Sequence, residues 1–233
     1  MTAHQFSLEG AVVATERPSH PAKYSDELLP VLAKLLRGRH ELLDPMAGTG
    51  KIAAIRRFNF DGHITCNDLE PEWTDPAFRV DEWHFSDAAS MDWANDGQLD
   101  AICTSPTYGN RMADHHEAQD GSRRYSYTHC LGHALHEGNT GQMQWGEAYR
   151  TKHVEIVREC RRVLKDIGVL VVNVSNHVRH GEIVDVVGWW RTIVPMLGFE
   201  FITEYEVPTK RMRNGANAEK RVDSESVLVF ERR

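Results

Sequence analysis

Apolar runs of strand length alternate with longer helical patterns along most of this chain, and this alternation restricts the fold more than any other feature. Parallel strands need a crossover connection, usually a helix, whereas antiparallel neighbours can be joined directly. The alternation therefore predicts an α/β fold with a mostly parallel sheet, helices on both faces and an antiparallel last pair of strands. The expected strands are Glu41–Leu43, Ile64–Asn67, Ala101–Thr104, Val169–Val174, Phe199–Val207 and Ser226–Glu231, and the expected helices are Ser25–Leu36, Ile52–Phe58, Trp145–Leu164 and Ile183–Leu197.

Length and composition fit one domain over residues 1–233, of which 41% are hydrophobic and 26% charged. No apolar run approaches the roughly 20 residues that span a bilayer. Residues 1–10 lack the basic start and apolar stretch of a secretory signal. We therefore expect no membrane partner and a cytoplasmic location. The four cysteines lie far apart without a C-x-x-C pair, so we expect reduced thiols.

The sharpest local signal is a glycine-bearing turn, Asp44-Pro45-Met46-Ala47-Gly48-Thr49-Gly50, which follows the first expected strand. Glycine lets a backbone approach a ligand where a Cβ would block the contact. The turn is not a P-loop, because the earlier glycine is missing and Ile52 takes the place of the magnesium-binding Ser or Thr. A chance Gly-x-Gly in an ordinary strand-to-helix turn is the alternative interpretation.

Acidic residues recur at later strand ends, after Ile64–Asn67 and again in Phe85-Ser86-Asp87-Ala88. Asp68 lies 18 residues after Gly50, and Glu70 follows closely. An acid about 20 residues past the glycines can accept hydrogen bonds from a ribose, and Asp87 could accept one from an adenine amine. Solvated carboxylates are the alternative. Residues 41–100 hold thirteen Asp and Glu against four Lys and Arg, within a formal net charge of -7. Such a segment would repel a pyrophosphate, so the acids indicate a nucleoside rather than a phosphate-rich nucleotide.

A second turn, Ser105-Pro106-Thr107-Tyr108, makes a family resemblance specific. The chain resembles the S-adenosylmethionine-dependent methyltransferases that methylate exocyclic amines of DNA bases, which carry an Asp-Pro-x-x-Gly-x-Gly turn and a (Asp/Asn/Ser)-Pro-Pro-(Tyr/Phe) turn. Asp44–Gly50 match the first turn in full, and Ser105–Tyr108 match the second except at Thr107. His20–Ser25 resemble the family's other cofactor element, and Leu164–Asn173 its fifth strand. The likeness covers nearly the whole chain and is closest to small phage and bacterial DNA methylases.

This resemblance implies a Rossmann-like class I methyltransferase fold, with a mostly parallel seven-stranded sheet and an antiparallel last strand. It implies S-adenosyl-L-methionine as cofactor and DNA as partner. Its regions would be an N-terminal cofactor element at 18–37, a substrate and target-recognition loop at 105–144 and a basic strand-connecting loop at 208–225. The cofactor-binding residues that it implies are Tyr24, Asp44, Pro45, Met46, Ala47, Gly48, Gly50, Asp68, Leu69, Asp87, Ala88 and Ser105.

The catalytic residues that the resemblance implies are Ser105, Pro106 and Tyr108. An aromatic amine is a poor nucleophile because its lone pair is conjugated into the ring. Hydrogen bonds to the Ser105 hydroxyl and the Pro106 carbonyl would let the nitrogen pyramidalise, while Tyr108 stacks on a base swung out of the duplex. The implied target is cytosine N4 or adenine N6, and the serine at the first position of the turn slightly favours cytosine N4. A cytosine-C5 methylase needs a cysteine just after the proline, whereas Cys103 lies upstream.

Thr107 departs from the family pattern, because the second proline is absent and a backbone N–H is restored. Three interpretations stay open: the turn tolerates threonine, the acceptor is unusual, or the site is impaired. Two functions therefore compete with DNA methylation. One is N-methylation of RNA or of a protein glutamine, and the other is a catalytically impaired partner subunit that binds S-adenosylmethionine.

Two polar stretches are candidates for DNA contact, and solvated loops are the alternative for both. Residues 109–153 hold six of the thirteen histidines among basic and aromatic residues. The absence of a recognition domain predicts a short target sequence or a homodimer. A metal site at His129, Cys130, His133 and His136 is disfavoured, because no second cysteine pair completes a tetrahedral set. The expected nucleic-acid-binding residues are Asn110, Arg111, Arg123, Arg124, Lys210, Arg211 and Arg213.

Overall fold

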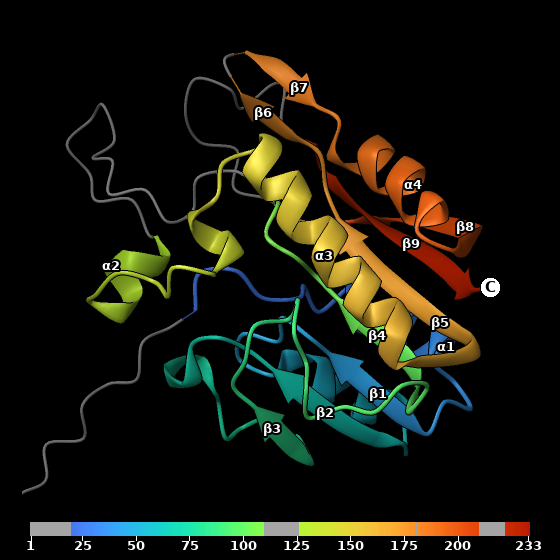
Figure 1. Ribbon diagram of the computed structural model, residues 1–233. Coiled ribbons are helices and arrows are strands. Elements are labelled where there is room, and N and C mark those ends of the chain that lie inside the picture. The colour runs from blue at the N-terminus through green and yellow to red at the C-terminus, as the bar shows by residue number, and fades with distance from the viewer. Residues whose placement is uncertain (1–19, 110–125, 180, 210–221) are drawn as a thin grey trace, which may run out of the picture.

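The computed structural model describes residues 20–109, 126–179, 181–209 and 222–233. Its centre is a seven-stranded sheet with strand order β3-β2-β1-β4-β5-β9-β8 (Figure 1). Pairing is parallel from β3 through β5, and β9 is antiparallel to both of its neighbours. The predicted fold class is therefore confirmed. The strands of this sheet are β1 (Glu41–Asp44), β2 (His63–Asn67), β3 (Glu82–His84), β4 (Leu99–Thr104), β5 (Leu164–Val174), β8 (Phe199–Pro208) and β9 (Ser224–Arg232).

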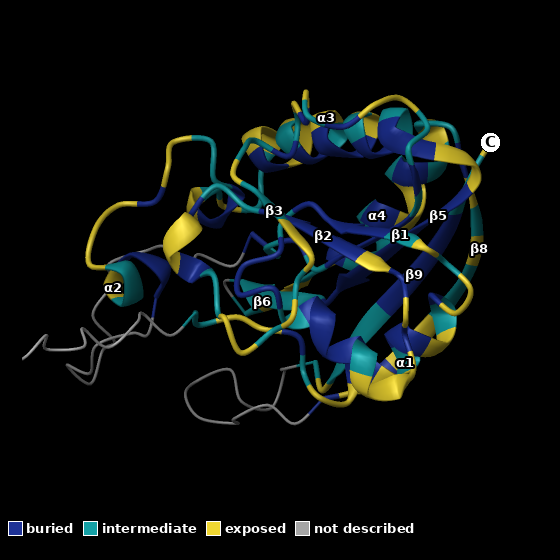
Figure 2. Ribbon diagram, turned by 90° about the horizontal axis from the view of Figure 1, so that it is seen from below, coloured by how far each residue is buried: buried dark blue, intermediate teal, exposed yellow. Residues whose placement is uncertain are grey.

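Helices cover both faces of the sheet. Successive residues of a strand point to opposite faces, so neighbouring residues of β1 pack against different helices. Leu42 of β1 packs in one core with α1 (Leu28–Leu35) and the 3-10 helix η1 (Lys51–Phe58). Its neighbour Leu43 packs in the other core with α3 (Glu147–Val163) and α4 (Val186–Met196). Figure 2 shows α1 and α3 on opposite sides of the sheet. No helix in the described ranges is long and apolar enough to cross a membrane.

Several local expectations differ from the structure. Ser25 does not begin the first helix: α1 starts at Leu28, whose N–H donates to the Ser25 carbonyl at 3.2 Å. The expected helix at 52–58 is a 3-10 helix. Ile183 belongs to a strand rather than to α4. The elements that were not expected from the sequence are short. They are β3, the hairpin of β6 (His177–Arg179) and β7 (Glu182–Val184), α2 (Tyr127–Leu131), η2 (Pro71–Trp73) and η3 (Thr140–Gln142).

The carboxyl ends of the parallel strands meet at one edge of the sheet, which is where ligands bind in open α/β sheets. The residues that end or follow β1 to β4 at this edge are Asp44, Asp68, Asp87 and Ser105. The buried Asn67 ties two of these turns together. Its Nδ2 donates to the carbonyls of Pro45 at 3.1 Å and Ser86 at 2.9 Å.

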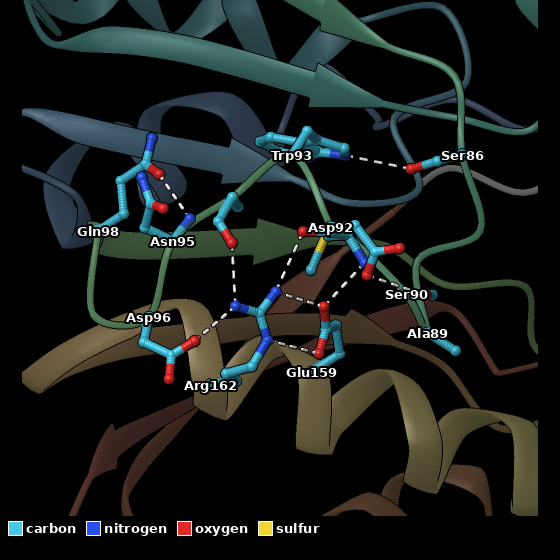
Figure 3. Close-up of polar contacts among 12 residues, drawn as sticks. Ser86, Ala89, Ser90, Asp92, Trp93, Asn95, Asp96, Gln98, Glu159 and Arg162 are labelled. Atoms are coloured by element: carbon cyan, nitrogen blue, oxygen red, sulfur yellow. Dashed lines mark hydrogen bonds and ion pairs between the residues drawn. The ribbon is translucent and has the colours of Figure 1, made fainter.

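Arg162 of α3 anchors the connection between β3 and β4 (Figure 3). Its guanidinium donates to the carbonyls of Met91 at 3.0 Å and Ala94 at 2.9 Å. In the same connection, Trp93 Nε1 donates to Ser86 Oγ at 3.1 Å. This network holds the acidic turn after β3 in a fixed position beside the first two strand ends.

Ile167 is a point of backbone strain at the start of β5. Its φ is 60°, and its side chain is 70% exposed. A β-branched residue is disfavoured in this left-handed conformation, and here its side chain gains little burial. We expect Ile167→Gly to raise the free energy of unfolding by about 1 kcal/mol in urea titrations. Ile183→Gly, in the extended strand β7, should lower it instead. A loss of stability in both variants would contradict the strain at Ile167.

Candidate active site

A cavity of about 460 Å³ opens at the carboxyl edge of the sheet, within the usual range for small-molecule sites. All three predicted catalytic residues line it: Ser105, Pro106 and Tyr108. Most of the predicted cofactor residues line it too, namely Tyr24, Pro45, Met46, Ala47, Asp68, Leu69, Asp87, Ala88 and Ser105. Asp44, Gly48 and Gly50 lie outside this wall.

The two glycines of the first turn are required by protein contacts rather than by the cavity. Gly50 has a φ of 77°, and a Cβ there would lie 2.8 Å from the side chains of Trp83 and Val80. A Cβ on Gly48, whose φ is 53°, would lie 3.1 Å from the His20 ring. The glycines therefore permit left-handed backbone and close packing behind the turn.

Asp44 lies behind the cavity wall and is fully buried. Tyr24 donates its hydroxyl to Oδ2 at 3.0 Å, and the Met46 N–H donates to Oδ1 at 3.2 Å. Burial raises the pKa of Asp44 to about 7, although these hydrogen bonds oppose the shift. Asp44 thus holds Tyr24, whose ring is part of the wall, and the turn itself.

The raised pKa of Asp44 predicts a pH-dependent stability. Between about pH 4 and pH 7 the folded state binds more protons than the unfolded state, so the free energy of unfolding falls as pH rises through this window. Relative to Asp44→Asn, the wild type should lose about 2.5 kcal/mol between about pH 5 and pH 8 in urea titrations. Burial also shifts the pKa values of Asp68, His20 and His153, and the comparison cancels their contributions because both proteins contain these groups. Parallel stability curves would contradict a buried, proton-binding Asp44.

Asp68 organises the turn that it faces. Its Oδ2 accepts the Gly48 N–H at 2.7 Å, and its Oδ1 accepts the Glu70 N–H at 2.9 Å. Burial raises its pKa to about 6, against these two hydrogen bonds. Each carboxylate oxygen has a second lone pair, so Asp68 can still accept from a diol in the cavity.

Glu70, the other acid proposed for a ribose, has a different task. It is buried, and its Oε1 accepts the His136 N–H at 2.6 Å and the Asn139 Nδ2 at 3.0 Å. These bonds dock the segment that carries η3 onto the acidic turn after β2. Glu70 is therefore a positioning residue for the cavity rim in this structure.

Lys152 is a neighbour of Asp87 that sequence reasoning missed. It forms an ion pair with Asp87 Oδ2, while Asp87 Oδ1 accepts the Ala89 N–H at 2.9 Å. Lys152 lies on α3, and 65 residues separate it from Asp87. The lysine fixes the direction of this carboxylate at the cavity wall.

An aromatic trio lines one side of the cavity: His20, Trp73 and Tyr127. His20 belongs to the predicted cofactor element and Tyr127 to the predicted loop at 105–144, whereas sequence reasoning did not select Trp73. The His20 ring lies 4.6 Å from Trp73 and 5.2 Å from Tyr127, edge to face in both cases. Burial lowers the pKa of His20 to about 4, so the ring is neutral at pH 7. The trio joins segments before β1, after β2 and in α2 around one apolar wall.

The Ser105–Tyr108 turn is tied to β5 and β9. Ser105 Oγ lies 3.3 Å from the Tyr108 hydroxyl, and the buried Asn173 of β5 donates from Nδ2 to Ser105 Oγ at 3.2 Å. Asn173 Nδ2 also lies 2.6 Å from Glu225 Oε2, and Glu225 of β9 lines the cavity. Sequence reasoning did not select Asn173 or Glu225.

Thr107 is held by two hydrogen bonds, one to its backbone carbonyl and one from its hydroxyl, and a proline could make only the first. Its Oγ1 donates to Thr140 Oγ1 at 3.1 Å, and its carbonyl accepts from the Tyr149 hydroxyl at 2.5 Å. Tyr149 is fully buried on α3. These contacts restrain the turn where the missing ring would have done so, which favours the interpretation that the turn tolerates threonine.

All predicted nucleic-acid-binding residues lie outside the described residues: Asn110, Arg111, Arg123, Arg124, Lys210, Arg211 and Arg213. Within the described ranges, no cluster of three or more His, Cys, Asp or Glu side chains could hold a metal ion. Cys103 is buried, and burial raises its pKa well above the usual value, so it is unsuited to act as a nucleophile. The described cysteines are all free thiols, as predicted.

Comparison with known families decides where the chain belongs. A family model for N6/N4 methyltransferases, described as DNA methylase, matches residues 99–233, more than half of the chain. The chain belongs to this DNA methylase family. It is therefore a methyltransferase, and the matched residues include the Ser105–Tyr108 turn, Asn173 and Glu225. No curated protein matches the chain.

Solved structures share the fold of this DNA methylase family member. The [4+2]-cyclase SpnF is 17% identical with a TM-score of 0.53, and the match covers 88% of this chain and 81% of SpnF. The N-methyltransferase NodS of Bradyrhizobium japonicum WM9 is 11% identical, with a TM-score of 0.51 and coverage of 88% and 93%. The 1,6-didemethyltoxoflavin-N1-methyltransferase of Burkholderia thailandensis, solved with S-adenosylhomocysteine, is 16% identical, with a TM-score of 0.50 and coverage of 89% and 79%. These include a cyclase, so the likeness shows the fold and not the reaction.

Proposed function

We propose that this protein transfers a methyl group from S-adenosyl-L-methionine to the exocyclic amine of a DNA base, cytosine N4 or adenine N6. The observation that carries the proposal is the Ser105–Tyr108 turn, which lines the same cavity as the strand-end acids Asp68 and Asp87. One cavity thus combines groups suited to an amine with groups suited to a nucleoside.

The turn has free acceptor capacity for an amine. Ser105 Oγ accepts one hydrogen bond from Asn173, and a hydroxyl oxygen has two lone pairs. The Tyr108 hydroxyl oxygen lies 3.3 Å away and can accept the Ser105 proton. The second lone pair of Ser105 Oγ and the Pro106 carbonyl can then take the two amine protons, which concentrates the nitrogen lone pair for attack. Tyr108, restrained through its hydroxyl, supplies a ring for stacking on an extruded base.

The reaction also needs a site for the cofactor, and the acidic turns after β2 and β3 are suited to this. Asp68 keeps lone pairs for a ribose diol, Asp87 is directed by Lys152, and Leu69 and Ala88 line the wall beside them. Bound S-adenosylmethionine would supply an electrophilic methyl group on a sulfonium. The acidic segment favours this cation, whereas it would repel a pyrophosphate. DNA as partner is proposed from the family and from the amine chemistry, and a homodimer is the proposed way to enlarge a short recognition surface.

Transfer of label from tritiated S-adenosylmethionine tests the proposal. Purified protein would be incubated separately with duplex DNA, total RNA and a protein mixture, and each polymer would then be counted. We expect label in DNA. Label confined to RNA or protein would support the competing N-methyltransferases, and cofactor binding without any transfer would support an impaired partner subunit.

A further inference from the structure

A carboxylate, Glu225, shares the cavity with the Ser105–Tyr108 turn. Glu225 lies on β9, and its Oε2 lies 2.6 Å from Asn173 Nδ2. The same Nδ2 lies 3.2 Å from Ser105 Oγ and 3.4 Å from the Tyr108 hydroxyl. An amide nitrogen carries two hydrogens, so Glu225 takes one and the turn shares the other. Asn173 therefore links the carboxylate directly to the turn.

The reaction needs a group that the turn does not supply. An amine that gains a methyl group becomes cationic and must lose a proton. Here the first position of the turn is Ser105, a neutral hydroxyl, rather than an acid. Asp44 is buried behind the wall, and Asp68 and Asp87 lie on the turns after β2 and β3 that are proposed for the cofactor. Glu225 is the carboxylate that contacts the network of the turn.

A second observation indicates a polar ligand at the same place. Thr209 follows β8 and is 7% exposed, and it lines the cavity with Glu225. Its Oγ1 is buried and has no hydrogen-bond partner among the described residues. A buried hydroxyl without a partner is costly, so a ligand group that pairs with Thr209 is expected there.

We propose that Glu225 accepts the proton of the amine during methyl transfer, and that Asn173 is the residue that positions it. This inference rests on the proposed function. The amine lone pair forms the N–C bond, and the C–S bond breaks with its electron pair moving to sulfur. The N–H bond breaks with its pair remaining on nitrogen, and the proton passes to a Glu225 carboxylate oxygen and then to water.

Single-turnover methyl transfer to duplex DNA tests this role. Glu225→Gln keeps an oxygen for Asn173 but cannot take up the proton, so the rate constant should fall about 100-fold. The dissociation constants for S-adenosylmethionine and for DNA, measured separately, should stay within about threefold of wild type. Glu231→Gln, on the same strand and far along it, is the matched control and should methylate at the wild-type rate.

Chemical rescue separates proton transfer from a structural role. In Glu225→Ala, added formate should restore the rate several-fold, whereas it should not rescue Glu225→Gln, in which the space is filled. An unchanged rate in Glu225→Gln, or a slow Glu225→Ala that formate does not accelerate, would overturn the assignment. These results require a wild type that labels DNA; a wild type that binds cofactor and labels no DNA refutes the proposed function instead.

Discussion

Replacing Ser105 by alanine is expected to slow methyl transfer to DNA about 100-fold, the usual effect of removing one well-placed hydrogen-bonding group from a transition state. The variant loses the oxygen that would accept an amine proton, and the nitrogen lone pair then stays conjugated. It also loses one contact to Asn173, although the Tyr108 hydroxyl remains within 3.4 Å of the same amide. The measurement is the single-turnover rate constant at saturating cofactor.

Ser90→Ala is the matched control for Ser105→Ala. Ser90 is exposed and lies outside the cavity wall, where its hydroxyl donates to Asp92 at 3.2 Å. This variant should methylate at the wild-type rate. Ser105→Ala should bind S-adenosylmethionine nearly as tightly as the wild type. Methylation that survives in Ser105→Ala would defeat the proposed role of the turn.

Replacing Asp68 by alanine should weaken cofactor binding about 100-fold, because two charge-assisted contacts to a ribose are each worth roughly 1.5–3 kcal/mol before compensation. The variant also releases the N–H groups of Gly48 and Glu70, which Asp68 holds at 2.7 and 2.9 Å. Isothermal titration calorimetry with S-adenosylhomocysteine measures the effect without any turnover.

Asp61→Ala controls for the loss of a negative charge near the same strand. Asp61 is exposed and precedes β2. We expect it to bind S-adenosylhomocysteine like the wild type. Equal affinities for Asp68→Ala and the wild type would mean that the acid serves only the glycine turn, and the proposed ribose contact would be wrong.

The architecture could be predicted because its longer elements carry strong periodic signals. The six expected strands and the helices at α1, α3 and α4 all exist, with bounds shifted by a few residues. Short elements could not be predicted, because β3 has three residues and α2 has five, too few for a period to be read. Ile183 was misassigned because it precedes a long helical pattern without a break, and the three-residue strands of its hairpin are too short to show a strand period.

The candidate site was predictable where it depends on strand ends. Parallel topology alone brings Asp68, Asp87 and Ser105 to one edge. The partners of these residues were not predictable, because Lys152 lies 65 residues from Asp87 and Asn173 lies 68 residues from Ser105. Only the packing of α3 and β5 creates these pairs.

The identity of the methylated nucleoside tests the central claim most directly. DNA methylated by the wild-type protein would be digested to nucleosides and analysed by mass spectrometry beside DNA treated with Ser105→Ala. We predict N4-methyldeoxycytidine or N6-methyldeoxyadenosine, and we expect the amount formed by the variant to be about 100-fold lower than that formed by the wild type. 5-Methyldeoxycytidine, or an N-methylated base at equal levels with both proteins, would contradict an exocyclic-amine methylase that acts through the Ser105–Tyr108 turn.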